Sequence, residues 1–252
     1  MQRFANPARF MRLSAAMLPW CGRATALLLA GGLYLALFVA PPDYQQGEAV
    51  RIMFVHVPAA WMASVVYALM ALASAVALIW RHPLADIAAR SAAPLGAGFT
   101  LLCLVTGSLW GEPMWGTWWV WDARLTSVLV LFFLYLGYIA LVNAFDEPTR
   151  GARAGAILAL VGIVNLPIIK FSVDWWNTLH QPASVFRLGG PTVDASMLWP
   201  LLIMALGFTL FFVTVLLIRM RTALIAAKIR ALRLAEVERE AERAALRHRA
   251  AS

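Results

Sequence analysis

Six long apolar runs constrain the fold of this chain more than any other feature. They cover approximately residues 24–40, 57–80, 91–109, 125–145, 154–169 and 197–218. Crossing a hydrocarbon core of about 30 Å takes roughly 20 helical residues. A helix satisfies its own backbone hydrogen bonds in lipid, and the two-residue alternation typical of a membrane β-barrel is absent. The runs therefore predict an all-α polytopic membrane protein with six transmembrane helices.

The distribution of lysine and arginine predicts the orientation of these helices. If the N-terminus is cytoplasmic, 17 of the 21 basic residues lie in cytoplasmic segments, and only Arg51, Arg124, Lys170 and Arg187 lie outside. The positive-inside rule therefore places both termini in the cytoplasm. The net charge of +8 then reflects membrane topology rather than nucleic-acid binding.

Composition divides the chain into two parts. Residues 1–218 form a six-helix transmembrane domain, whereas residues 219–252 are rich in alanine, leucine, glutamate and arginine and predict a basic helical cytoplasmic tail. The fifth apolar run is short and contains Pro167, which predicts a kink or an end near that residue. Cys21 and Cys103 are predicted not to pair, because they lie in different parts of the membrane domain.

A tryptophan-rich segment, residues 110–124, separates the third run from the fourth. It holds five of the eleven tryptophans in the chain. If this segment is helical, Trp115, Trp118, Trp119 and Asp122 follow i, i+3, i+4, i+7 spacing and share one face. That arrangement would form an aromatic shelf beside a carboxylate, suited to a large flat apolar ligand or to a membrane–water boundary.

Two of the four histidines lie close to this segment in the predicted topology. His56 and His180 fall at the outer boundary, in the loops before and after the tryptophan-rich segment, whereas His82 and His248 look like surface residues. A neutral imidazole is a common ligand of haem iron, so the pair could take its two axial positions on either side of the shelf. The alternative is an ordinary aromatic belt with hydrogen-bonded boundary histidines. Spacing alone leaves both interpretations open.

Further residues narrow the classes of function. Arg51 and Arg124 could pair with carboxylates of a ligand, although Arg124 could equally pair with Asp122 or cap the fourth helix. The centres of the six runs contain no acidic or basic residues, which argues against a proton-coupled transporter. No Walker A motif is found, so any ATP-driven step belongs to another chain.

Three motifs together resemble a known family. Residues 115–126, W-G-T-W-W-V-W-D-A-R-L-T, resemble the tryptophan-rich WWD signature of proteins that handle haem in cytochrome c biogenesis. Residues 54–61, F-V-H-V-P-A-A-W, and residues 175–182, W-W-N-T-L-H-Q-P, resemble the flanking histidine motifs of its haem exporter protein C branch, also called cytochrome c maturation protein C (CcmC). The resemblance covers nearly the whole chain up to about residue 221.

The resemblance implies that His56 and His180 are axial iron ligands of a transiently bound haem b. It also implies a porphyrin platform on the periplasmic side of the bacterial inner membrane, and no catalytic residue. The residues expected around the haem are Trp61, Trp115, Trp118, Trp119, Trp121, Trp175, Trp176, Asp122, Arg124 and Arg51.

The family also implies partners. Haem would pass to a periplasmic haem chaperone, CcmE, and the chain would act within an ABC-type complex with the ATPase CcmA, the membrane subunit CcmB and the one-span subunit CcmD. The alternative is a cytochrome c haem lyase of the same WWD superfamily, although such enzymes usually carry more histidines. A transporter or scaffold whose aromatic residues only anchor it is the third interpretation.

Overall fold

The computed structural model describes residues 6–182, 184, 185 and 187–251, with the side chains of the last helix up to residue 243. Helices dominate this part of the chain. In order they are α1 (Pro7–Tyr34), η1 (Leu35–Val39), η2 (Glu48–Ile52), α2 (Met53–Trp80), α3 (Pro83–Trp115), α4 (Ala123–Asn143), α5 (Pro148–Gly162), α6 (Asn165–Trp175) and α7 (Ala195–Ala251). The predicted all-α class is confirmed.

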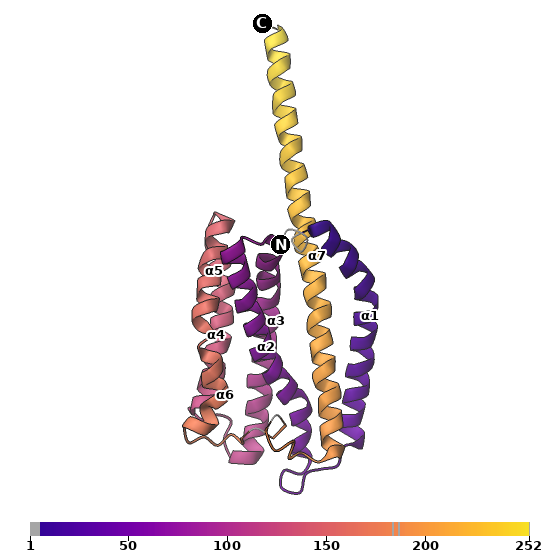
Figure 1. Ribbon diagram of the computed structural model, residues 1–252, viewed down its shortest axis with the longest axis vertical. Coiled ribbons are helices and arrows are strands. Elements are labelled where there is room, and N and C mark those ends of the chain that lie inside the picture. The colour runs from indigo at the N-terminus through magenta and orange to yellow at the C-terminus, as the bar shows by residue number, and fades with distance from the viewer. Residues whose placement is uncertain (1–5, 183, 186, 252) are drawn as a thin grey trace.

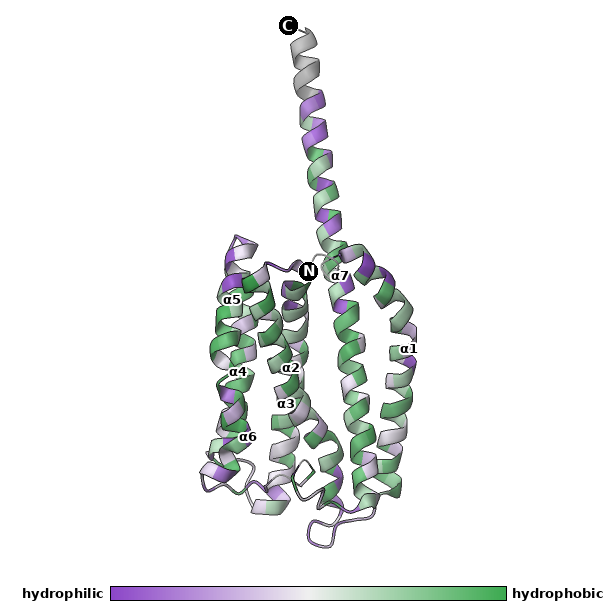
Figure 2. Ribbon diagram, in the orientation of Figure 1, coloured by the Kyte–Doolittle hydropathy of each residue, from purple (hydrophilic) through white to green (hydrophobic). Residues whose placement is uncertain are grey.

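Six helical segments are long and apolar enough to cross a membrane, as predicted. They are Pro7–Val39, Glu48–Trp80, Pro83–Trp115, Ala123–Asn143, Pro148–Trp175 and Ala195–Arg243. Hydrophobic residues dominate these segments, whereas hydrophilic residues occur in the connections and alternate with hydrophobic ones along the projecting part of α7 (Figure 2). The helices extend beyond the apolar runs, so several of the predicted helices begin too late or end too early in the sequence.

Polar residues outside the apolar runs set several helix ends. The Asn6 side chain accepts hydrogen bonds from the backbone of Ala8 and Arg9 at 2.9 and 3.2 Å and so begins α1. His82 begins α3, because its Nδ1 accepts a hydrogen bond from the backbone N–H of Ala85 at 3.3 Å. The side chain of the other predicted surface histidine, His248, lies outside the described residues. These caps explain why the helices start earlier than hydropathy alone indicates.

The fifth span is broken, close to where Pro167 predicts. Helix α5 ends at Gly162 and α6 begins at Asn165. Proline lacks a backbone N–H, and its ring clashes with the carbonyl four residues earlier, which here belongs to Ile163. The break therefore falls at the turn that the proline ring would disrupt.

The six spans run alternately up and down, with α5 and α6 together forming the fifth (Figure 1). Helix α1 therefore starts at the end of the bundle from which the C-terminal part of α7 projects. The connections after α1, α3 and α6 gather at the opposite end, which we call the tryptophan end because residues 115–121 lie there. Helix α7 continues without a break from Ala195 to Ala251.

Two close helix pairs build the bundle. Helix α2 packs most extensively against α3, and α1 against α7. The largest fully buried side chains of α2 and α4 include Tyr67 and Tyr135, whose rings meet edge to face at 5.1 Å. The Tyr135 hydroxyl donates to the Ala63 carbonyl at 2.8 Å. This aromatic core holds together the helices that carry the candidate site.

Candidate functional site

A large cavity lies at the tryptophan end. Its volume is about 1310 Å³, and α2, α3, α4, α6, α7 and the connections between them line its walls. Typical small-molecule sites have volumes of about 300–1,000 Å³, so this cavity can accept a ligand larger than most metabolites. The aromatic and imidazole side chains in its wall are Tyr44, His56, Trp61, Trp110, Trp115, Trp119 and His180.

His56 is buried in this wall. It lies on α2 rather than in the preceding loop, so the prediction that it precedes the second helix is wrong. The helix begins before the apolar run, with the 3-10 turn η2 ahead of it. His56 Nδ1 lies 3.1 Å from the Cys103 carbonyl of α3, which leaves Nε2 as the nitrogen available for a metal.

His180 reaches the same cavity from the connection between α6 and α7. Its Nδ1 lies 3.1 Å from the carbonyl of Gln181, and its ring is 6.3 Å from that of Trp115. As for His56, a carbonyl oxygen accepts from Nδ1 and leaves Nε2 available. Partial burial lowers the pKa of His180 below the ordinary value, and nearby Arg124 lowers it further. The imidazole therefore remains neutral, the form that binds metals, at lower pH than an ordinary histidine.

The tryptophan-rich segment is not a continuous helix, so the predicted helical shelf is wrong. Helix α3 ends at Trp115, and Gly116 adopts a left-handed conformation with φ of 70°. Glycine commonly ends helices in this way because it lacks a Cβ. The chain then runs without regular structure to Asp122, which begins α4.

This backbone path divides the predicted aromatic residues into two groups. Trp61, Trp115 and Trp119 line the cavity. Trp118 and Trp121 are instead 58% and 76% exposed, and Trp175 and Trp176 are also exposed. These four are not among the described residues that line the cavity.

Asp122 links the start of α4 to the loop that carries His180. One carboxylate oxygen accepts from the Leu125 backbone at 2.7 Å, and the other accepts from the Thr178 hydroxyl. The Thr178 oxygen in turn accepts from the His180 backbone N–H at 3.1 Å. Asp122 is thus a helix cap that also positions His180.

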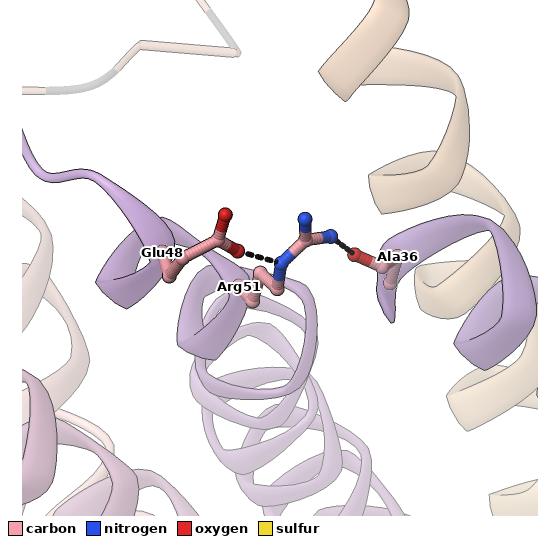
Figure 3. Close-up of polar contacts among 3 residues, drawn as sticks. All are labelled: Ala36, Glu48 and Arg51. Carbon is pink, nitrogen blue, oxygen red and sulfur yellow. Dashed lines mark hydrogen bonds and ion pairs between the residues drawn. The ribbon is translucent and has the colours of Figure 1, made fainter. Parts of the chain in front are cut away.

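The two predicted arginines have different surroundings. Arg124 lines the cavity and donates to the Ser172 hydroxyl of α6 at 2.9 Å, and the described residues contain no ion pair between Arg124 and Asp122. Arg51 pairs with Glu48 and donates to the Ala36 carbonyl at 2.7 Å (Figure 3). It joins η2 to η1 and is not among the described cavity-lining residues.

Comparison with known proteins identifies the family. The sequence profile of the Heme exporter protein C family matches residues 1–235. The chain belongs to this family. A Heme exporter protein C from Bradyrhizobium diazoefficiens is 60% identical over 237 residues, which are 94% of this chain and 90% of the relative. Those from Haemophilus influenzae and Escherichia coli K12 are 48% and 47% identical, covering 88% and 89% of this chain and 90% and 91% of the relatives.

Trp110 and Gln46 also line the cavity, although neither was predicted to belong to the site. Trp110 packs edge to face against His56 with ring centroids 5.6 Å apart, and its Nε1 donates to the Gln46 side chain at 3.0 Å. Trp110 belongs to the tryptophan-rich segment, but it lies outside the predicted shelf of Trp115, Trp118, Trp119 and Asp122. Trp110 lies about one helical turn after Gly107 on α3, and both residues contact His56. The sequence shows this spacing, but the spacing points to His56 only once the pairing of α2 with α3 is known.

Proposed function

We propose that this chain binds haem in the cavity at the tryptophan end, with His56 and His180 as the axial iron ligands. The observation that carries the proposal is that two imidazoles from distant parts of the sequence line one cavity, each with Nδ1 next to a carbonyl. A haem iron already has four ring nitrogens and needs only two further ligands. Trp61, Trp115 and Trp119 offer apolar surfaces to the porphyrin.

The proposed direction of transfer is from this cavity to a periplasmic haem chaperone of the CcmE type. Most of the arginine and lysine residues lie in the segments at the opposite end of the bundle, which supports a periplasmic tryptophan end in the bacterial inner membrane. A site at the end of the bundle leaves one edge of the haem within reach of a soluble partner. Membership of the Heme exporter protein C family supports a place beside CcmA, CcmB and CcmD in an ABC-type complex for cytochrome c biogenesis. The proposed role is binding and transfer rather than covalent chemistry.

The decisive experiment compares haem absorbance of the full chain with that of a His56→Ala/His180→Ala double variant. Both proteins are purified in detergent after expression with haem available, and equal amounts are mixed with haem-free chaperone. We expect a Soret band and transfer of haem for the native chain, and neither for the double variant. An unchanged Soret band in the double variant would show that the two histidines do not hold the iron.

Asp122→Ala is expected to weaken haem binding through His180. Loss of an N-cap costs about 1 kcal/mol of stability, and loss of a group that orients a metal ligand typically costs about 10-fold or more in affinity. We therefore expect haem loss about 10-fold faster than in the native chain, measured by transfer to apomyoglobin. Asp122→Asn keeps the cap through its amide oxygen, and its amide nitrogen can donate to the Thr178 oxygen instead of accepting from it, so this variant should retain haem better than Asp122→Ala.

The control for the Asp122 variants is Asp174→Ala. Asp174 also lines the cavity, but it is exposed on α6. If Asp174→Ala accelerates haem loss as much as Asp122→Ala does, the effect comes from the charge of the cavity and not from the position of His180.

A further inference from the structure

The side chain of His56 is held from the neighbouring helix by more than one group. Its Nδ1 lies 3.1 Å from the Cys103 carbonyl and 3.1 Å from the hydroxyl oxygen of Thr106. Both partners belong to α3, and His56 belongs to α2. The orientation of the imidazole is therefore set where the two most extensively packed helices meet.

The two groups next to Nδ1, the Cys103 carbonyl and the Thr106 hydroxyl, together determine which imidazole nitrogen carries the proton. The Thr106 hydroxyl donates to the Leu102 carbonyl one turn earlier at 2.6 Å, with the Cys103 carbonyl as a second, more distant acceptor at 3.3 Å, so its only proton is directed to backbone carbonyls. Towards His56 the hydroxyl oxygen can only accept, and so can the Cys103 carbonyl. Nδ1 must therefore be the protonated nitrogen of neutral His56, and Nε2 carries the free lone pair.

Gly107 provides the space for this orientation. A Cβ at this position would lie 3.0 Å from Cε1 of His56, which is closer than side chains normally pack, and at an ordinary contact distance of 3.5 Å from Nδ1. Trp110 also meets the ring, edge to face, at a centroid distance of 5.6 Å. The ring is thus confined by packing as well as by hydrogen bonds.

We propose that Thr106 is a positioning residue for haem: its hydroxyl fixes His56 with Nε2 presented to the iron, and Gly107 provides the room for that ring position. This inference rests on the proposed ligation of haem by His56. A hydrogen bond donated by Nδ1 also makes the imidazole a stronger electron donor. The stronger donor stabilises ferric over ferrous iron and lowers the reduction potential of the bound haem.

The test replaces Thr106 in the full chain loaded with haem and measures two quantities, the reduction potential and the rate of haem loss to apomyoglobin. Thr106→Val keeps the shape of the side chain but removes the acceptor. We expect a more positive potential and haem loss about 10-fold faster, since groups that orient metal ligands typically contribute 10–100-fold to affinity. Thr106→Ser retains the hydroxyl and should restore both values.

The matched control is Thr100→Val on the same helix. The Thr100 hydroxyl also donates one turn back, to the Gly96 carbonyl at 2.7 Å, and Thr100 is fully buried. It does not line the cavity. Thr100→Val should therefore leave the potential and the rate of haem loss unchanged while removing the same type of helix contact.

The possible outcomes separate this inference from the proposed function. If His56→Ala loses haem but Thr106→Val has native potential and retention, or if Thr106→Ser behaves like Thr106→Val, the positioning role is wrong and the ligand assignment stands. If His56→Ala keeps haem with an unchanged spectrum, the proposed function itself fails. Should Thr106→Val not fold, Gly107→Ala replaces it: displacement of the ring should again accelerate haem loss, and native retention would overturn the inference.

Discussion

Replacing His56 with glycine is expected to remove most of the haem that the chain retains. The imidazole is buried in the cavity wall and its orientation is set by α3, so its removal takes away the ligand that the packing of α2 against α3 presents to the iron. Loss of a direct ligand should cost at least the roughly 10–100-fold in affinity that loss of an outer group costs. The measurement is haem content per protein after purification, with the spectrum of the residual haem changed from six-coordinate to five-coordinate.

Addition of imidazole to the His56→Gly variant should restore part of the lost binding, because the substitution leaves a space of the size of the missing ring. The matched control is His82→Asn, which removes a histidine from the other end of α3 while keeping a residue that caps helices well. It should retain native haem content. Native haem content in His56→Gly without added imidazole would contradict the ligand assignment.

The fold follows from sequence largely because lipid permits few alternatives. A backbone segment in hydrocarbon must satisfy its own hydrogen bonds, so apolar run length predicts the number of helices. The ends are harder to predict, because a helix continues into the polar boundary until a cap stops it. Asn6 and His82 begin helices well before the apolar runs at residues 24 and 91. Hydropathy reports the lipid-facing part of each helix and not its full extent.

The candidate site was only partly predictable for a different reason. Residue type and topology predicted that His56 and His180 lie at one end of the bundle among tryptophans, and both line one cavity there. The helical shelf failed because Gly116 ends α3, and a glycine at such a position is itself a sequence signal for a helix end. The i, i+3, i+4 spacing holds only within a continuous helix. Trp118 follows Gly116, so it lies on the exposed surface and not in the cavity wall.

The contacts that orient the two histidines could not be read along the chain. Thr106 and His56 are 50 residues apart, and Asp122 and Thr178 are 56 apart. Each contact exists because two helices, or a helix and a loop, pack in one particular register. Chemical type predicts which residues can bind iron, whereas only the packing predicts which residues hold them in place.

Gly96→Ala is expected to be among the most destabilising small substitutions in the membrane core. A Cβ at Gly96 would lie 2.1 Å from Cζ of Tyr135 and 2.3 Å from its hydroxyl oxygen. Tyr135 cannot move without cost, since it is fully buried, its hydroxyl donates to Ala63, and its ring packs against Tyr67. Overpacking and loss of a buried hydrogen bond together cost on the order of 2–4 kcal/mol. The readout is the thermal unfolding midpoint in detergent, which should fall on the order of 10 °C.

Two further variants test whether contact with Tyr135 is the cause. Gly98→Ala, two residues along the same helix, has open space around the added Cβ and should leave the midpoint unchanged or raise it, because alanine favours helices more than glycine does. Tyr135→Leu removes the two ring carbons and the hydroxyl oxygen that the Gly96→Ala methyl would meet, so the Gly96→Ala/Tyr135→Leu pair should be more stable than the sum of the two single effects predicts. Tyr135→Phe removes only the hydroxyl, and the ring carbons at 2.1 and 2.2 Å would still collide with the methyl group. Equal midpoints for Gly96→Ala and Gly98→Ala, or strict additivity with Tyr135→Leu, would show that α3 and α4 do not pack through this contact.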